Sequence, residues 1–218
     1  MIEIPKFKNS ALFKQAFIHR SYLNETKEDL TSNERLEFLG DSIISFIVSD
    51  YLFQKFKNFN EGILTNLRSL LVNTKSLAAL ARSLNFGDLL MVSKGEEESK
   101  GRQNQSLLAN SFEAFIGALF LDQGLDKVKE FLEEVLLPQA DFYVKNKIFK
   151  DPKSLLQERV QSQKRGSLIY KVIDEAGPAH AKIFTVGVFI NDLSFGEGKG
   201  KSKQEAEENA AQQALERL

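Results

Sequence analysis

Carboxylates at helical spacing are the groups in this sequence best suited to chemistry. Glu34, Glu37 and Asp41 follow one another at intervals of three and four residues in the segment NERLEFLGD, so a helix would place them on one side. Apolar residues at helical spacing border them, so this acidic ridge adjoins buried surface. Because the three like charges repel one another, we expect a cation to compensate them.

A second helical segment, SLLANSFEAFIGALFLD, carries Asn110 and Glu113 three residues apart. The segment is otherwise apolar, and an unpaired buried carboxylate is costly. Oxygen ligands that converge from two helices suit Mg²⁺, which binds few carboxylates and retains exchangeable waters. A pair of such ions supports in-line attack of water on a phosphodiester, so the pattern predicts metal-dependent hydrolysis without a protein nucleophile.

A solvated helix face is the alternative for the acidic ridge, whose members could simply pair with Arg35, Arg68 or lysines. Glu113 favours the metal site, because it lies in an apolar helix. Glu61 stays ambiguous, since an acidic residue in the first turn of a helix also stabilises the helix dipole.

Composition excludes several other kinds of site. The 218 residues include no cysteine and only two histidines, which excludes disulfides, thiol nucleophiles and thiolate zinc sites. His19 has no recognisable serine partner in a sharp turn, so a hydrolytic triad is rejected. The net charge of −1 means that any nucleic-acid contact must come from local clustering of lysines.

Neither a secretory signal nor a membrane span is recognisable. The amino terminus carries charges from Glu3 onward, and the most apolar run, Ile43 to Val48, is far shorter than the roughly 20 residues that a spanning helix needs. We therefore expect a cytoplasmic protein with no membrane partner.

The apolar periodicity divides the chain into two domains. From Asn9 to about Lys145 apolar residues recur at three and four positions, which predicts an all-α catalytic domain, a helical bundle over residues 1–147. The lysine-rich stretch KNKIFKDPK predicts a linker at 148–152. Residues 153–218 then follow the order α-β-β-β-α, which predicts a small α+β domain.

In this second domain the alternation of Phe184, Val186, Val188 and Ile190 predicts a strand with one apolar face. The glycine run that follows is one residue short of the nucleotide-binding pattern G-x-x-x-x-G-K-[ST], because Phe195 occupies the position of the first glycine. The run also follows the third strand of a small antiparallel pattern. We therefore expect no nucleotide cofactor.

Two segments carry a family resemblance. NERLEFLGDS and SFEAFIGALFLD resemble the signature elements of ribonuclease III, and the α-β-β-β-α domain resembles its double-stranded RNA-binding domain. The likeness covers nearly the whole chain. It implies an endonuclease that hydrolyses double-stranded RNA with Mg²⁺, two ions per site and Mn²⁺ as a substitute, leaving 5′-phosphate and 3′-hydroxyl ends with short 3′ overhangs. It also implies substrates among ribosomal RNA precursors and structured messenger RNAs.

The resemblance assigns site roles by position. It implies metal ligation by three carboxylates and one amide, and an acidic rim made by two further glutamates. The predicted ligands are Glu37, Asp41, Asn110 and Glu113, and the predicted rim residues are Glu34 and Glu61.

Asn110 departs from the family pattern, which usually has aspartate there. Its amide oxygen can still coordinate a metal but brings no negative charge. One alternative is an active enzyme in which the other carboxylates suffice. The other is a cleavage-deficient double-stranded RNA-binding protein.

The resemblance also implies a homodimer in which Phe38 inserts into the partner subunit. The alternative for Phe38 is a core position within its own chain, because aromatic residues at helical spacing are usually buried.

Three regions of the second domain are implied to contact RNA, by shape and through the sugar-phosphate backbone. They are the first helix, the GPAH turn and the lysine run before the last helix; the residues are Gln157, Glu158, Gln161, His180, Lys199, Lys201 and Lys203. Gln204 is a departure, because a further lysine is common there. The alternatives are a simple turn at GPAH and a solvated lysine cap.

Overall fold

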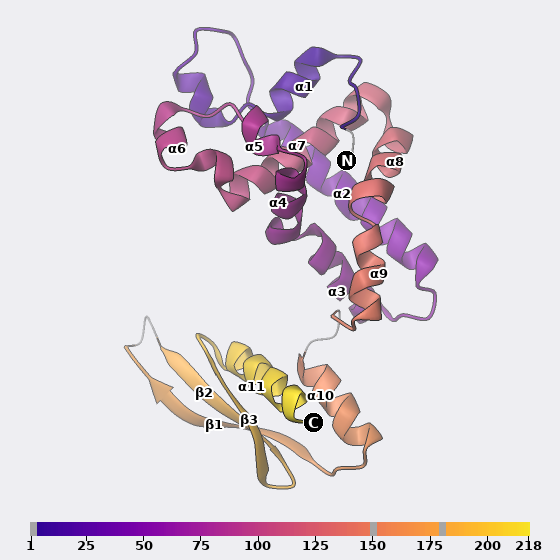
Figure 1. Cartoon of the computed structure of the whole chain (residues 1–218), viewed down its shortest axis with the longest axis vertical. Coiled ribbons are helices and arrows are strands. Elements are labelled where there is room, and N and C mark those ends of the chain that lie inside the picture. The colour runs from indigo at the N-terminus through magenta and orange to yellow at the C-terminus, as the bar shows by residue number, and fades with distance from the viewer. Residues whose placement is uncertain (1–3, 149–151, 179–181) are drawn as a thin grey trace. The chain divides into compact units, whose positions relative to one another are not determined.

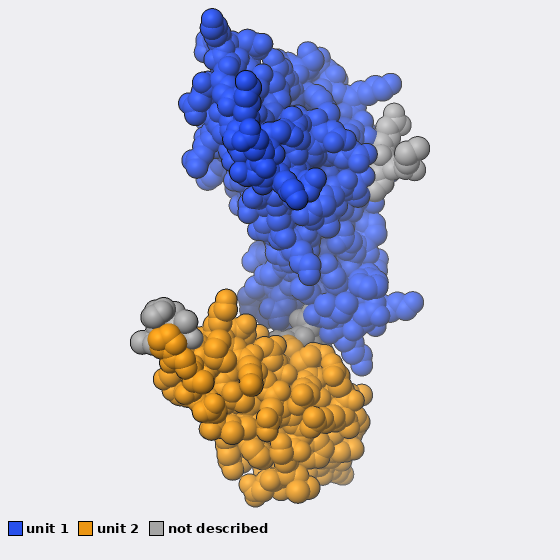
Figure 2. Space-filling view, turned by 60° about the vertical axis from the view of Figure 1, so that its left-hand side comes forward, with its two compact units in different colours: residues 1–149 blue, residues 150–218 orange. Residues whose placement is uncertain are grey.

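The computed structural model describes residues 4–148, 152–178 and 182–218. The chain divides into two compact units, residues 1–149 and 150–218 (Figure 2). The first is helical, and the second combines helices with a sheet (Figure 1). The predicted fold class, an all-α domain joined to an α+β domain, is therefore confirmed.

The first unit is built from helices. Among the described residues of both units, no helix is long and apolar enough to cross a bilayer. The bounds of the helices in the first unit are α1 (Ser10–Ala16), η1 (Arg20–Asn24), α2 (Glu34–Lys55), α3 (Glu61–Val72), α4 (Thr74–Ser83), α5 (Phe86–Leu89), α6 (Lys94–Glu98), η2 (Gly101–Gln103), α7 (Gln105–Gln123), α8 (Leu125–Val135) and α9 (Pro138–Lys145).

Helix α7 is the centre of this unit, with α2 and α4 packed against it (Figure 1). Most of its side chains are buried, as expected for a helix with few polar residues in its middle. Around Phe115 aromatic rings meet edge-on or tilted, and the centroid of Phe86 lies 5.1 Å from that of Phe115. The polar groups of α7 are therefore held on a rigid apolar element.

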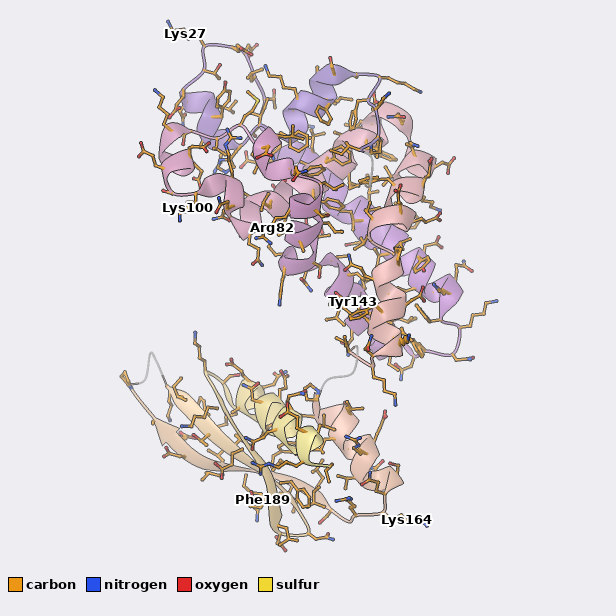
Figure 3. All side chains as sticks on the ribbon, viewed as in Figure 1. Lys27, Arg82, Lys100, Tyr143, Lys164 and Phe189 are labelled. Atoms are coloured by element: carbon orange, nitrogen blue, oxygen red, sulfur yellow. The ribbon has the colours of Figure 1, made fainter. Side chains whose placement is uncertain are left out.

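The second unit is a three-stranded antiparallel sheet in the order β1-β2-β3 with two helices. Its elements are α10 (Pro152–Ser162), β1 (Leu168–Ala176), β2 (Ile183–Ile190), β3 (Leu193–Gly200) and α11 (Lys203–Arg217). Val186, Val188 and Ile190 are buried and Phe184 is half-buried, as the alternation predicts. Phe189 (Figure 3) lies on the other face, where the Lys171 ammonium is 5.1 Å from its ring centroid.

The glycine run in β3 lets the sheet approach α11 closely. A Cβ added to Gly198 would lie 2.2 Å from the backbone nitrogen of Ala210, and one on Gly200 would lie 2.6 Å from that of Ala206. The small residues on both sides thus serve the packing of the strand on the helix. This contact gives the run a structural role without a bound nucleotide.

Candidate active site

The site is set by a close crossing of α2 and α7. A Cβ added to Gly40 in α2 would lie 1.8 Å from the backbone oxygen of Glu113, and one on Gly117 in α7 would lie 2.2 Å from the oxygen of Leu36. The two backbones therefore touch where only glycine fits. Since Gly40 directly precedes Asp41, this contact brings the acidic ridge of α2 against the polar face of α7.

A pocket of about 590 Å³ opens at this crossing. Its lining includes Glu34, Glu37 and Asp41 from α2, together with Asn110 and Glu113 from α7. Five of the six predicted ligand and rim residues thus line one pocket, and their roles stay predictions.

Glu113 has the most strongly perturbed carboxyl group of this pocket. Burial raises its pKa to about 7, and repulsion from Asp41 and then Glu37 adds to the rise. Burial next to like charges is the condition expected of a carboxylate that serves as a ligand for a metal ion.

Glu37 is perturbed in the same direction. Burial raises its pKa, repulsion from Glu34 adds to this, and a smaller contribution comes from Asp41. A hydrogen bond with the Asn110 side chain opposes the rise. Asn110 therefore stabilises the charged form of Glu37 in a way that an ionised aspartate would not.

The donor set fits a hard divalent cation. Within the described ranges, no lysine, arginine or histidine forms an ion pair with Glu37, Asp41 or Glu113. Across those same ranges, no three acidic or imidazole groups are already gathered as a metal-binding cluster. What favours a metal here is the set of oxygen donors that line the pocket, because oxygen is the ligand atom that Mg²⁺ prefers.

The two predicted rim residues lie in different places. Glu34 lines the pocket, where its carboxylate accepts from Ser32 Oγ at 2.9 Å and lies 3.6 Å from the Arg20 guanidinium. Glu61 does not line it. The carboxylate of Glu61 accepts from Thr65 Oγ1 at 3.1 Å in the first turn of α3, and the residue borders a separate depression.

Phe38 is 79% exposed on α2. The alternative that it is a core residue of its own chain is therefore wrong. Phe46 and Phe53, which follow on the same helix, are also exposed. Exposed aromatic side chains that follow one helix are typical of an interaction surface.

The predicted RNA-contact residues of the second unit lie at its surface where they are described. Gln157, Glu158 and Gln161 are exposed on α10, whose buried side carries Leu156 and Val160. His180 lies outside the described residues.

Lys199, Lys201 and Lys203 are also exposed, at the end of β3 and the start of α11. Lys203 lies 3.4 Å from Glu175, so part of its charge is already compensated. The positive charge of this cluster therefore comes mainly from Lys199 and Lys201.

Sequence reasoning missed three polar residues of the pocket: His19, Arg20 and Asn33. Asn33 is buried, and its side-chain Nδ2 donates to the Ala16 oxygen at 3.1 Å. Sequence reasoning could have found Asn33, because it is the first residue of the segment NERLEFLGD. His19 and Arg20 come from a separate segment, so only the fold brings them to the site.

The raised pKa of Glu113 predicts a pH-dependent response to Mg²⁺. The pKa of Glu113 is about 7 in the folded protein, against the ordinary value of 4.5. Protonated Glu113 therefore contributes its full stability to the metal-free fold below about pH 4.5, and this contribution is lost as the pH rises through about 7. Mg²⁺ competes with that proton. We therefore expect Mg²⁺ to raise the melting temperature more at pH 8 than at pH 6, as thermal denaturation with and without the ion can measure.

The matched control is Glu113→Gln, which should flatten both the pH dependence of the metal-free protein and the difference between the Mg²⁺ effects. An equal Mg²⁺ effect at pH 6 and pH 8 in the unsubstituted chain would contradict the assignment.

Comparison with known proteins agrees with this arrangement. Residues 9–140 match the family described as Ribonuclease-III-like, and residues 152–218 match the double-stranded RNA binding motif. The chain is 50% identical to Ribonuclease 3 of Geobacillus kaustophilus (strain HTA426) and 47% identical to that of Bacillus velezensis (strain DSM 23117 / BGSC 10A6 / LMG 26770 / FZB42). Each alignment covers 97% of this chain, and 86% and 85% of the respective relatives.

Two solved structures are also similar. The nuclease domain of ribonuclease III from Campylobacter jejuni, described for structural flexibility in a region involved in dimer formation, has a TM-score of 0.57 and 38% identity; the match covers 62% of this chain and 90% of that one. Dicer from Pichia stipitis has a TM-score of 0.51 and 29% identity, over 98% of this chain and 96% of that one. The carboxylate pocket and these matches together establish that the chain belongs to the ribonuclease III family of endoribonucleases, with a double-stranded RNA-binding motif in its second unit.

Proposed function

We propose that the chain cleaves double-stranded RNA by Mg²⁺-dependent hydrolysis at the pocket between α2 and α7. The observation that carries this proposal is the group of uncompensated carboxylates from two helices, with Glu113 held at a pKa of about 7. Products with 5′-phosphate and 3′-hydroxyl ends and short 3′ overhangs follow from the family resemblance.

Glu37, Asp41 and Glu113 would hold the metal, with the amide oxygen of Asn110 as a neutral donor. When bound, Mg²⁺ supplies Lewis-acid stabilisation of the phosphoryl oxygens and a more acidic water. The protein's own part is to keep these side chains on rigid helices and to hold the pKa of Glu113 at about 7, so that a metal ion can displace its proton near neutral pH. Mn²⁺ prefers similar oxygen ligands and would substitute.

A homodimer is the assembly that we propose. Exposed Phe38 lies beside a depression lined in part by Leu36, Leu39 and Leu121. In a symmetric dimer the Phe38 ring of each copy can fill the depression of the other copy. Both copies would then bury the same apolar surface. Sedimentation of the full chain tests this, and Phe38→Ser should shift it toward the monomer.

The cellular role that we propose is cytoplasmic processing of ribosomal RNA precursors and structured messenger RNAs. The family resemblance supports this role. Within the chain, the exposed lysines and glutamines of the second unit are suited to duplex RNA of any sequence, because A-form RNA offers its hydroxyls and phosphates rather than base edges.

Incubation of the full chain with a defined RNA duplex, with and without Mg²⁺, tests the function. Discrete shortened products that require the ion would support the enzyme. A retarded but intact duplex at every Mg²⁺ concentration would instead support the second candidate, a binding protein without cleavage, which Asn110 motivates.

Asn110→Asp is expected to raise the affinity for Mg²⁺ by about tenfold, because the added charge strengthens an oxygen-ligand site. Without the ion it should destabilise the fold, since the hydrogen bond to Glu37 becomes a repulsion. Cleavage titrated with Mg²⁺ and melting without it measure the two effects. Activity that appears only in the aspartate variant would reject the proposal that the chain with Asn110 is an active enzyme.

A triple variant with alanine at Lys199, Lys201 and Lys203 should bind duplex RNA more weakly and with less dependence on salt. The slope of log binding constant against log salt concentration should fall by about one for each phosphate that is no longer neutralised. Mg²⁺-dependent chemistry at saturating RNA should change little. Lys171→Ala removes a charge from the sheet face and serves as the control. An unchanged slope in the triple variant would reject this contact region.

A further inference from the structure

His19 occupies a fixed position at the edge of the acidic pocket. Its backbone N–H donates to the Met91 oxygen at 3.0 Å, and the N–H of Asn33 donates to the oxygen of the preceding Ile18 at 2.9 Å. Backbone hydrogen bonds thus connect Ile18 and His19 both to Met91, before α6, and to Asn33, at the start of α2. The half-buried imidazole caps η1 and lines the pocket.

The hydrogen bonds around the ring select one tautomer. The backbone N–H of Ser21 donates to Nδ1 of His19 at 3.3 Å, so Nδ1 is an acceptor. The Ser21 hydroxyl oxygen accepts from the Ser93 N–H at 3.0 Å and lies 2.8 Å from the same Nδ1, within hydrogen-bond distance. The proton of the neutral imidazole is therefore on Nε2.

The Nε2–H group is a donor in a pocket dominated by acceptors. An RNA strand that enters brings further negative charge next to four carboxylates, so hydrogen-bond donors in the pocket lining would favour its binding. Arg20 shares its charge with Glu34, and the Asn110 side chain is hydrogen-bonded to Glu37. Within the part of the chain that is described, no hydrogen bond engages Nε2 of His19.

We propose that His19 is a further substrate-binding residue, which donates a hydrogen bond from Nε2–H to a backbone oxygen of the RNA strand in the acidic pocket. The Ser21 hydroxyl and the Ser93 N–H act as positioning groups, because they hold the proton on the edge of the ring that is free for RNA. This inference rests on the proposed function, since it places the RNA strand at the same pocket.

His19→Asn separates this role from the structural one. Asparagine caps helices well, and its Oδ1 can accept from the Ser21 N–H as Nδ1 does, but it has no group at the position of Nε2. We expect an unchanged melting temperature and a kcat/KM for duplex cleavage lower by about 10- to 100-fold, the effect of losing one hydrogen bond to a charged group.

His19→Gln is the complementary variant, because its amide nitrogen reaches as far as Nε2 but cannot cap η1 in the same way. It should regain most of the lost kcat/KM while melting at a lower temperature. Wild-type kcat/KM in His19→Asn would overturn the proposal, as would losses in both variants that merely follow their melting temperatures.

A spectroscopic measurement on the full chain tests the contact without cleavage. The chain has two histidines, and His19→Asn assigns their ¹⁵N signals. We expect the Nε2–H tautomer for His19, and a shift of its Nε2 signal when an RNA duplex is added without divalent metal. Absence of that shift, with the duplex bound, would overturn the proposal. If the unsubstituted chain fails to cleave with Mg²⁺, the proposed function fails, whereas the tautomer and the shift still decide the role of His19.

Discussion

Glu113→Gln is expected to lower Mg²⁺-dependent cleavage of duplex RNA by about 10³-fold or more, because a lost metal ligand removes several kcal/mol of charge stabilisation at the transition state. The substitution keeps the size of the side chain. It also removes a carboxylate that is desolvated and repelled by Asp41 and Glu37, so the metal-free protein should melt at the same temperature or higher. Single-turnover cleavage and thermal denaturation measure the two effects.

Glu133→Gln is the matched control. It makes the same change of charge at an exposed position of α8, away from the pocket, and should cleave like the unsubstituted chain. Cleavage by Glu113→Gln at the unsubstituted rate would remove Glu113 from the mechanism. Lost cleavage together with a large fall in melting temperature would instead indicate a structural role.

Gly40→Ala is expected to destabilise the first unit by about 3 kcal/mol or more, near or beyond the upper end of ordinary overpacking. The added methyl group would lie 1.8 Å from the backbone oxygen of Glu113, and a backbone atom cannot turn aside as a side chain can. For a domain of this size the melting temperature should fall by roughly 10 °C. Any folded fraction should also cleave poorly, because the helices that carry the carboxylates must move apart.

Gly95→Ala provides the comparison for this substitution. Gly95 lies in α6 and has no neighbour within 4 Å of an added Cβ, so alanine should be neutral or stabilising by about 0.5–1 kcal/mol. Equal melting temperatures for Gly40→Ala and the unsubstituted chain would contradict the close crossing of α2 and α7.

The proposed dimer contact and the proposed metal site would use opposite properties of neighbouring residues on α2. Phe38 is exposed and apolar, whereas Glu37 points into the pocket and is half-buried. Adjacent positions on a helix are about 100° apart, so one helix can present both surfaces. This arrangement links the proposed assembly of two copies to the position of the carboxylates.

The helical first unit, the α-β-β-β-α order of the second and the acidic ridge of α2 could be predicted from the sequence, because periodicity and turn residues act over a few neighbours. The same holds for the buried face of β2. The separate depression that Glu61 borders could not be predicted, and the exposure of Phe38 was implied only by the family resemblance, since both depend on which surfaces the other helices cover.

The sequence by itself determined which donors exist and on which face of each helix they lie. Only the tertiary structure decided that Glu37 and Glu113 share a pocket, and that His19 joins them from a distant segment. The physical reason is the contact of Gly40 with the backbone of α7, a long-range fit of two helices that neither local pattern contains. The raised pKa of Glu113 follows from that contact, because burial and neighbouring charge exist only once the helices have packed.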